Sequence, residues 1–158
     1  KNYQLSSIGL RFFNVYGPGE LYKDKTSSMV IQLAHQILNG KAPRLFAGSN
    51  KISRDFIYID DVIQSNIKAC NSKDNGTYNI GTGIPTNFQE IADILQKELK
   101  TNLGTEYFPN PFNGYQLHTQ ADISNTKKNL GFEPKFSLED GIKSYIPEIL
   151  RTYNADIL

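Results

Sequence analysis

The sequence has a single cysteine, a single methionine and no tryptophan. Cys70 has no partner for a disulfide within the chain, which is typical of a protein in a reducing compartment, and we expect a cytoplasmic location. An excess of either charge is also lacking, because 17 basic and 16 acidic residues give a net charge of +1. That balance argues against nucleic acid as the main partner. No apolar run approaches the length of a membrane span, so we expect no membrane partner.

The chain has 158 residues, and 39% of them are hydrophobic, which is enough for a core in one domain or in parts of two. It begins at Lys1 without an initiator methionine, and the first residues run directly into an apolar segment. We therefore expect a truncated, C-terminal portion of a larger protein. There is no internal repeat and no low-complexity linker, so composition alone marks no domain boundary.

Segments rich in strand-forming residues alternate with segments of helical periodicity, and this pattern predicts an α/β fold. The expected strands cover residues 8–16, 56–59, 77–80 and 105–108. The first of them has the apolar density of a strand that is buried on both faces of a parallel sheet. The expected helices cover about 29–38, 60–70, 88–99, 125–130 and 138–150.

Capping signals define the ends of these helices. Ser27 or Ser28 can cap the first helix, Asn87 and Glu90 have the spacing of a capping box, and Gly131 can end the fourth helix. The second helix opens with two carboxylates, Asp60 and Asp61, that we expect to cap its free N–H groups. Its apolar stripe is predicted from residues that recur at helical spacing: Ile63, Ile67 and Cys70.

Two polar segments follow the end of the first predicted strand, where α/β sheets commonly bind ligands. Asn14 could bond a ligand hydroxyl, or it could bond its own backbone in a turn. Lys23 and Lys25 lie in the loop that comes next. A lysine beside a cleft can hold a phosphate or move a proton, but a solvated loop lysine is the ordinary alternative.

The segment 45–50 has the composition of a nucleotide-diphosphate site. Phe46 can stack on a flat ring, the small residues Gly48 and Ser49 allow close approach to the backbone, and Arg54 offers a planar fork that suits a diphosphate. The alternative is a surface hairpin with a structural ion pair between Arg54 and Asp55.

Other segments carry weaker signals. Residues 81–83, Gly-Thr-Gly, lack the third glycine and the Lys-Ser/Thr of phosphate-binding fingerprints, so a tight turn is favoured there. His35 and His118 have no companion at metal-ligand spacing, and we expect both to be structural or solvated and no metal to be bound.

Three ordered motifs resemble the extended short-chain dehydrogenase/reductase family, whose members are NAD(P)-dependent sugar-nucleotide epimerases, dehydratases and reductases: Arg11–Pro18, Arg54–Val62 and Tyr78–Gly83. The resemblance implies the last part of a Rossmann-type parallel sheet, over about 1–20 and 54–75, interleaved with a small α/β substrate-binding domain, over about 21–53 and 76–158. The glycine-rich cofactor motif and the Tyr-x-x-x-Lys pair of that family are not in this sequence. We therefore expect this portion alone to be inactive.

The same resemblance implies roles for individual residues. Asn14 would bond the substrate, Val15 would touch the nicotinamide end of the cofactor, and Lys23 would be an acid/base group at the cofactor, opposite the absent tyrosine. Arg54 would grip the diphosphate and Tyr115 would close over it. The further implied substrate contacts are Lys25, Gln32, Phe46, Ala47, Gly48 and Ser49. Lys25 and Gln32 depart from the Ser and His of some members.

Three finer segments most resemble the branch of the family that acts on an ADP-linked sugar: Glu20–Lys23, Leu45–Ser49 and His118–Asp122. The resemblance implies an ADP-sugar substrate, NADP as cofactor with NAD as a possibility, and a homo-oligomer for the full-length protein. One alternative is another NAD(P)-dependent 4-epimerase or 4,6-dehydratase of sugar nucleotides. A second alternative, from another class, is a sugar-nucleotide-binding module without catalysis.

Overall fold

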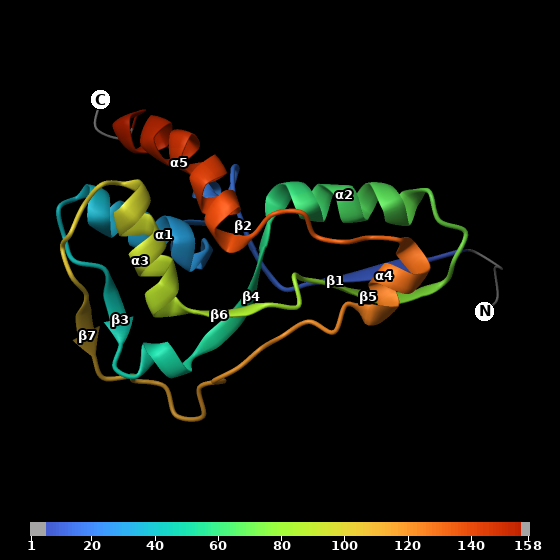
Figure 1. Ribbon diagram of the computed structural model, residues 1–158, viewed down its shortest axis with the longest axis horizontal. Helices are drawn as coiled ribbons and strands as arrows, with labels where there is room; N and C mark the ends of the chain where they lie inside the picture. The colour runs from blue at the N-terminus through green and yellow to red at the C-terminus, as the bar shows by residue number, and fades with distance from the viewer. Residues whose placement is uncertain (1–5, 156–158) are drawn as a thin grey trace.

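A computed structural model describes residues 6–155 of the chain and confirms an α/β fold with parallel strand pairs (Figure 1). The strands form three small sheets. Two of these are parallel pairs: β1 (Ile8–Phe12) with β5 (Gly76–Ile80), and β3 (Arg44–Phe46) with β7 (Glu106–Phe108). In the third, β4 (Ser53–Tyr58) lies between β2 (Asn14–Tyr16), which is parallel to it, and β6 (Pro85–Asn87), which is antiparallel.

Five α-helices and two short 3₁₀ helices of the described chain surround these sheets: α1 (Met29–Leu38), α2 (Ile59–Cys70), α3 (Phe88–Glu98), α4 (Ser124–Leu130), α5 (Leu138–Ala155), η1 (Leu21–Thr26) and η2 (Ser49–Lys51). Figure 1 shows α1 and α3 beside β3 and β7 at one end of the molecule, and α2 along β1 at the other end. The long connection from β7 to α4 passes β4 on its way between the two ends. Among the described residues, no helix has the length and apolar content that crossing a membrane requires.

The capping signals place the helix ends correctly because they act over a few residues. Ser28 Oγ accepts a hydrogen bond from the Ile31 amide at the start of α1. Asn87 Oδ1 accepts one from the Glu90 amide, 2.9 Å away, at the start of α3. Gly131 ends α4 with a left-handed φ of 60°.

The first predicted strand was wrong in two respects. It is divided at Phe13, because β1 pairs with β5 whereas β2 pairs with β4. It is also not buried on both faces, since Gly9, Arg11 and Phe12 are exposed. The physical reason is that α2 covers only one face of β1 in the described chain.

The predicted apolar stripe of α2 lies on the wrong side of the helix. Ile63 and Ile67 are each 47% exposed and Cys70 is exposed, whereas Val62 and Ser65 are buried. Periodicity shows that a helix has an apolar face, but it does not show which face a neighbour covers.

The two aspartates of α2 do not cap its N-terminus. Asp61 is buried, and its carboxylate accepts hydrogen bonds from the backbone amides of Lys135 and Phe136, at 2.9 and 3.1 Å. It therefore fixes the segment that enters α5, while Asp60 is exposed at the surface.

The core has two clusters, and β4 contributes to both. Phe56 and Tyr58 pack with α1, α3 and α5 in the larger cluster, whereas Ile57 packs with Tyr78 and Ile80 in the smaller one. Successive residues of a strand point to opposite faces, so Arg54 shares a face with Phe56, and Asp55 shares the other face with Ile57.

Pairing between β1 and β5 also bears on the predicted domain division. The boundary after residue 75 would separate β5 from its partner β1, yet the two strands belong to one sheet. The domain division itself stays a prediction.

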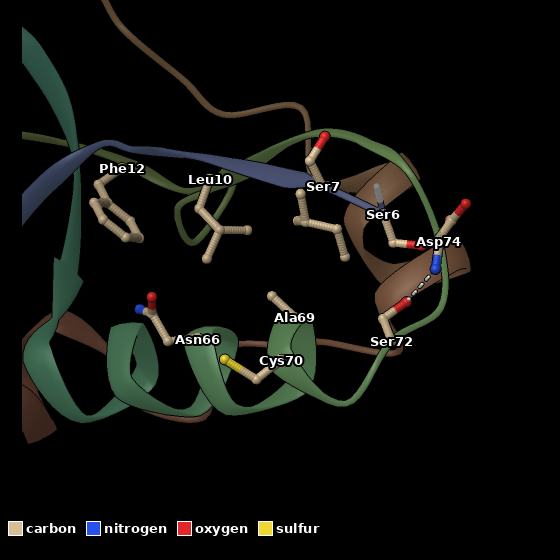
Figure 2. A pocket seen from close by; sticks show the side chains of 10 residues that line it. Ser6, Ser7, Leu10, Phe12, Asn66, Ala69, Cys70, Ser72 and Asp74 are labelled. Carbon is tan, nitrogen blue, oxygen red and sulfur yellow. Dashed lines mark hydrogen bonds between the residues drawn. The ribbon is translucent and has the colours of Figure 1, made fainter. Parts of the chain in front are cut away.

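A groove of about 580 Å³ lies between β1 and α2. Figure 2 shows Leu10 and Phe12 of β1 pointing toward Asn66 and Ala69 of α2 across this groove. Within residues 6–155, β5 is the one strand paired with β1, so the opposite edge of β1 presents unpaired backbone groups.

We expect the isolated chain to self-associate through this edge, because an open strand edge beside exposed apolar side chains is a template for pairing. In sedimentation velocity, the average mass should rise with concentration. Phe12→Lys should suppress the rise by placing a charge in the groove, whereas Phe112→Lys, at another exposed phenylalanine, should not. A clean monomeric profile of the unaltered chain at high concentration would contradict this expectation.

Candidate functional site

A cleft of about 340 Å³ opens at the end of the molecule where α1, α3, β3 and β7 meet. Half of its lining residues are aromatic; the ten are Met29, Gln32, Gln36, Arg44, Leu45, Phe46, Phe88, Phe108, Phe112 and Tyr115. An apolar, aromatic cleft with a few polar groups at its margin is the usual form of a small-molecule site.

Phe46 occupies the centre of this aromatic lining. Its ring meets Phe108 and Tyr115 edge-on, with ring centroids 5.0 and 5.5 Å apart. The Phe112 and Tyr115 rings stack at 6.2 Å with an interplanar angle of 25°. Such a set of flat faces and edges is suited to a planar ring such as a nucleobase.

Arg54 lies directly behind two of the rings that line the cleft. Its guanidinium carbon is 5.2 Å from the centroid of Tyr115 and 6.0 Å from that of Phe88, and the residue is 8% exposed. The guanidinium donates to the carbonyls of Ser53 and Gln116, at 2.9 and 2.5 Å. An arginine has five N–H donors, so three are not used by these two bonds.

Asp55 turns away from Arg54, and the alternative of an ion pair between these neighbours is wrong. Its fully buried carboxylate accepts four hydrogen bonds of 2.7 to 2.9 Å, from Thr82 N and Oγ1, Gly83 N and Ala121 N. The amides of residues 82 and 83 are therefore committed to Asp55, which supports a tight turn there rather than a phosphate loop. A Cβ on Gly81 would lie 2.6 Å from Ala121 Cβ, so this close approach requires glycine.

The segment that carries Tyr115 is attached to the first residue of β4. Ser53 N donates to Leu117 O at 2.8 Å, and Thr119 N donates to Ser53 O at 3.1 Å. Ser53 Oγ and His118 Nδ1 are hydrogen-bonded at 2.8 Å. Ser53 thus joins β4 to the segment that carries Tyr115. His118, which was expected to be structural or solvated, is exposed and bonds Ser53.

Four of the predicted site residues gather at the cleft. Gln32, Phe46 and Tyr115 line it, and Arg54 lies behind it. Lys25 lines a neighbouring hollow of about 420 Å³, which also includes Gln32. The Gln32 amide donates to Ser27 O at 2.7 Å.

The structure does not place the other predicted residues in the lining of that cleft. Ala47 and Gly48 are exposed and Ser49 is buried, and the turn they form relies on the left-handed φ of 81° at Gly48. This segment enters the 3₁₀ helix η2 and not the surface hairpin of the alternative.

Three further predicted residues lie nearer the start of the chain. Asn14 is exposed and opens β2, and Val15 is half-buried against the smaller core cluster. Lys23 is exposed in η1.

Three buried tyrosines have pKa values that are unsuited to acid/base catalysis, so none of them can replace the catalytic tyrosine that the family resemblance implies. Burial raises the pKa of Tyr16, Tyr58 and Tyr145 above the ordinary tyrosine value, and neighbouring groups add to the effect. A tyrosine that accepts a proton near neutral pH needs the opposite shift in its pKa. In residues 6–155, no group of three or more His, Cys, Asp or Glu side chains could hold a metal ion.

Sequence reasoning missed two buried carboxylates, Asp55 and Glu20, and three of the five aromatic residues that line the cleft. Asp55 could have been separated from Arg54 by the alternation of a strand. Glu20 and Phe112 lie in polar or proline-rich loops, where no periodic signal marks a residue as buried or as part of a cleft.

The model of the NAD dependent epimerase/dehydratase family matches residues 1–81, which is more than half of the chain. The chain belongs to this family. The match includes the segment of Asn14 and Lys23 and the whole of β4 with Arg54.

Solved structures of sugar-nucleotide epimerases have the same fold. The Helicobacter pylori ADP-L-glycero-D-manno-heptose-6-epimerase is 43% identical, with a TM-score of 0.85 over 92% of this chain and 45% of that chain. The Thermotoga maritima UDP-glucose 4-epimerase, solved with UDP-glucose, is 31% identical, with a TM-score of 0.86 over 95% and 48%. The Bacillus cereus UDP-glucuronic acid 4-epimerase, solved with UDP-glucuronic acid and NAD, is 28% identical, with a TM-score of 0.81 over 96% and 48%. This chain therefore spans less than half of the length of these structures.

Proposed function

We propose that the chain provides the substrate-binding half of an NADP-dependent ADP-L-glycero-D-manno-heptose 6-epimerase. The full-length protein would convert ADP-D-glycero-D-manno-heptose to its C6 epimer, for the core of lipopolysaccharide. The observation that carries the proposal is Arg54, whose guanidinium is held beside an aromatic cleft and has three donors that Ser53 O and Gln116 O do not use. The 43% identity to the Helicobacter pylori heptose epimerase over 92% of this chain supports the choice of sugar.

The cleft suits the ADP part of this substrate. Adenine would pack against Phe46 and Tyr115, because both present ring surface to the cleft. The diphosphate would bind the Arg54 guanidinium in place of Gln116 O, since a charge-assisted bond is stronger than a bond to a neutral carbonyl. The segment that carries Tyr115 must then shift as substrate binds.

The described residues do not form a dinucleotide site by themselves. The amides of residues 82 and 83 are used by Asp55, and Val15 is packed into a core cluster, so at most its edge could meet a nicotinamide ring. A bound nicotinamide cofactor supplies an acceptor for the C6 hydride and a donor that returns it. The relatives solved with NAD make NAD the alternative to NADP.

Lys23 would act as a proton carrier at the C6 oxygen. Inversion by oxidation and reduction removes a proton from the carbinol oxygen and later returns one, and each face of the sugar needs its own group. Lys23 is exposed on a loop that follows β2, and Asn14 at the start of that strand would bond the sugar. The buried tyrosines stay protonated and leave the second face to a group outside the described residues.

The test is turnover by the full-length protein that contains this chain, supplied with NADP. Proton NMR should show inversion of ADP-D-glycero-D-manno-heptose at C6, with little conversion of UDP-glucose or dTDP-glucose. Conversion of UDP-glucose at C4 would favour a 4-epimerase, the activity named for the Thermotoga maritima protein. Loss of water from dTDP-glucose would favour a 4,6-dehydratase. Binding without turnover of any of the three would favour a non-catalytic module.

A further inference from the structure

The loop that carries Lys23 is closed at its base by one buried carboxylate. Glu20 is 3% exposed, although it lies in a segment whose next residues, from Tyr22 to Thr26, are all exposed. A buried carboxylate is costly unless hydrogen bonds satisfy it. The partners of Glu20 therefore show what it holds.

The Glu20 side chain joins the two ends of the loop. One oxygen accepts from Gly17 N at 3.2 Å and from Ser28 Oγ at 2.8 Å. The other oxygen accepts from Ser28 N at 2.6 Å. Gly17 directly follows β2, and Ser28 is the N-cap of α1, so this one carboxylate links the end of a strand to the start of a helix.

The backbone of Glu20 also contacts the lysine itself. Its carbonyl accepts a hydrogen bond from the Lys23 amide at 3.0 Å. Inside the loop, Thr26 Oγ1 donates to Lys23 O at 2.6 Å, and Ser27 Oγ donates to Asp24 O at 2.7 Å. The conformation around Lys23 is thus set by short-range bonds, and Glu20 fixes where the whole loop is attached.

We propose that Glu20 is a positioning residue for Lys23. It acts by clamping Gly17 to Ser28, which fixes the lysine relative to the sugar, and this inference rests on the proposed function of Lys23. The three hydrogen-bond partners of the carboxylate are donors, and so is the Tyr145 hydroxyl that lies close to Glu20. Both carboxylate oxygens must therefore be acceptors. Glu20→Gln keeps the volume but turns one acceptor into an NH₂ group that faces a donor.

The variants should separate positioning from binding. Displacement of a catalytic group by about 1 Å can reduce turnover roughly a hundredfold. In the full-length enzyme, we expect Glu20→Gln to lower kcat roughly tenfold and Glu20→Ala roughly a hundredfold. The KM for the ADP-sugar should change less than about twofold, because Arg54 is held by β4 and Gln116. Ser28→Thr keeps the hydroxyl and amide donors and should retain nearly full kcat. Ser28→Ala removes the hydroxyl donor and should lose part of the kcat.

Ser137→Ala is the matched control for lost stability. Ser137 Oγ accepts from Asp140 N at 3.1 Å at the start of α5, so the variant removes a helix cap without removing any hydrogen-bond partner of the Glu20 carboxylate. Its kcat should stay within about twofold of the unaltered enzyme. An equal loss of kcat in Ser137→Ala and in Glu20→Gln would overturn the inference.

Amide hydrogen exchange provides a readout that does not depend on activity. The Gly17 and Ser28 amides should be protected in the unaltered protein and should exchange at least tenfold faster in Glu20→Gln. Unchanged protection of these amides in Glu20→Gln would overturn the inference. If Lys23→Met inactivates the enzyme, faster exchange in Glu20→Gln with an unchanged kcat would also overturn it. Full turnover by Lys23→Met would instead contradict the proposed role of Lys23. Amide exchange in Glu20→Gln would still show whether Glu20 holds Gly17 and Ser28 together.

Discussion

We expect Arg54→Met to weaken ADP-sugar binding by about a hundredfold. A hydrogen bond to a charged group contributes about 1.5–3 kcal/mol, and each 1.4 kcal/mol is about a factor of ten in affinity. Arg54→Lys should recover only a small part of the loss, because an ammonium group lacks the planar fork and cannot span two phosphate oxygens. Isothermal titration of the full-length protein with the ADP-sugar measures the effect.

Arg151→Met is the control for removal of an arginine. Arg151 pairs with Glu148 at the surface, where its side chain is 69% exposed, and exposed ion pairs contribute little. Its affinity should match that of the unaltered protein. A thermal melt should show that Arg54→Met remains folded, since Arg54 also holds Gln116. Unchanged affinity in a folded Arg54→Met protein would remove Arg54 from the substrate site.

Lys23→Met should lower kcat by roughly two to four orders of magnitude, the contribution typical of a positioned proton carrier. Binding of the ADP-sugar should survive, because the cleft and Arg54 belong to other elements than η1. Rapid-quench turnover and equilibrium titration of the full-length enzyme separate the two quantities.

Lys25→Met tests whether the loss is specific to Lys23. Lys25 lies in the same exposed loop, and its side chain lines the hollow beside the cleft. This variant should raise KM more than it lowers kcat, if Lys25 contacts substrate as the resemblance implies. Unchanged turnover in Lys23→Met would contradict the proton-carrier role.

The parts of the fold that depend on local chemistry could be predicted. The Ser28 cap, the Asn87–Glu90 box and the left-handed Gly131 each act within three or four residues, and each ends or starts a helix as expected. The alternation of strands and helices gave the fold class for the same reason, because periodicity is a local property.

The errors occur where a distant partner decides. The division of the first strand follows from β5 and β4, which lie more than 35 residues away in the sequence. The strand β6 was missed because its three residues are held by β4 rather than by a pattern of their own. Asp61 was assigned to its own helix, yet it binds amides 74 and 75 residues farther along the chain.

The candidate site shows the same limit. Family resemblance pointed to Phe46, Arg54 and Tyr115, and the structure brings them together. The resemblance could not show that the Arg54 guanidinium donates a hydrogen bond to Gln116 O or that it lies over the Phe88 ring, since both contacts join different parts of the chain. The positions of Asn14 and Lys23 relative to the sugar stay predictions.

The location of the nucleotide tests the account most directly. The groove of Figure 2 is larger than the aromatic cleft, about 580 against 340 Å³, but Phe12 is the one aromatic residue among the described residues that line it. Intermolecular nuclear Overhauser effects should be measured between the adenine H2 and H8 protons of bound ADP-sugar and assigned ring protons of the full-length protein. The account predicts contacts with Phe46 and Tyr115, and contacts with Phe12 in their place would contradict it.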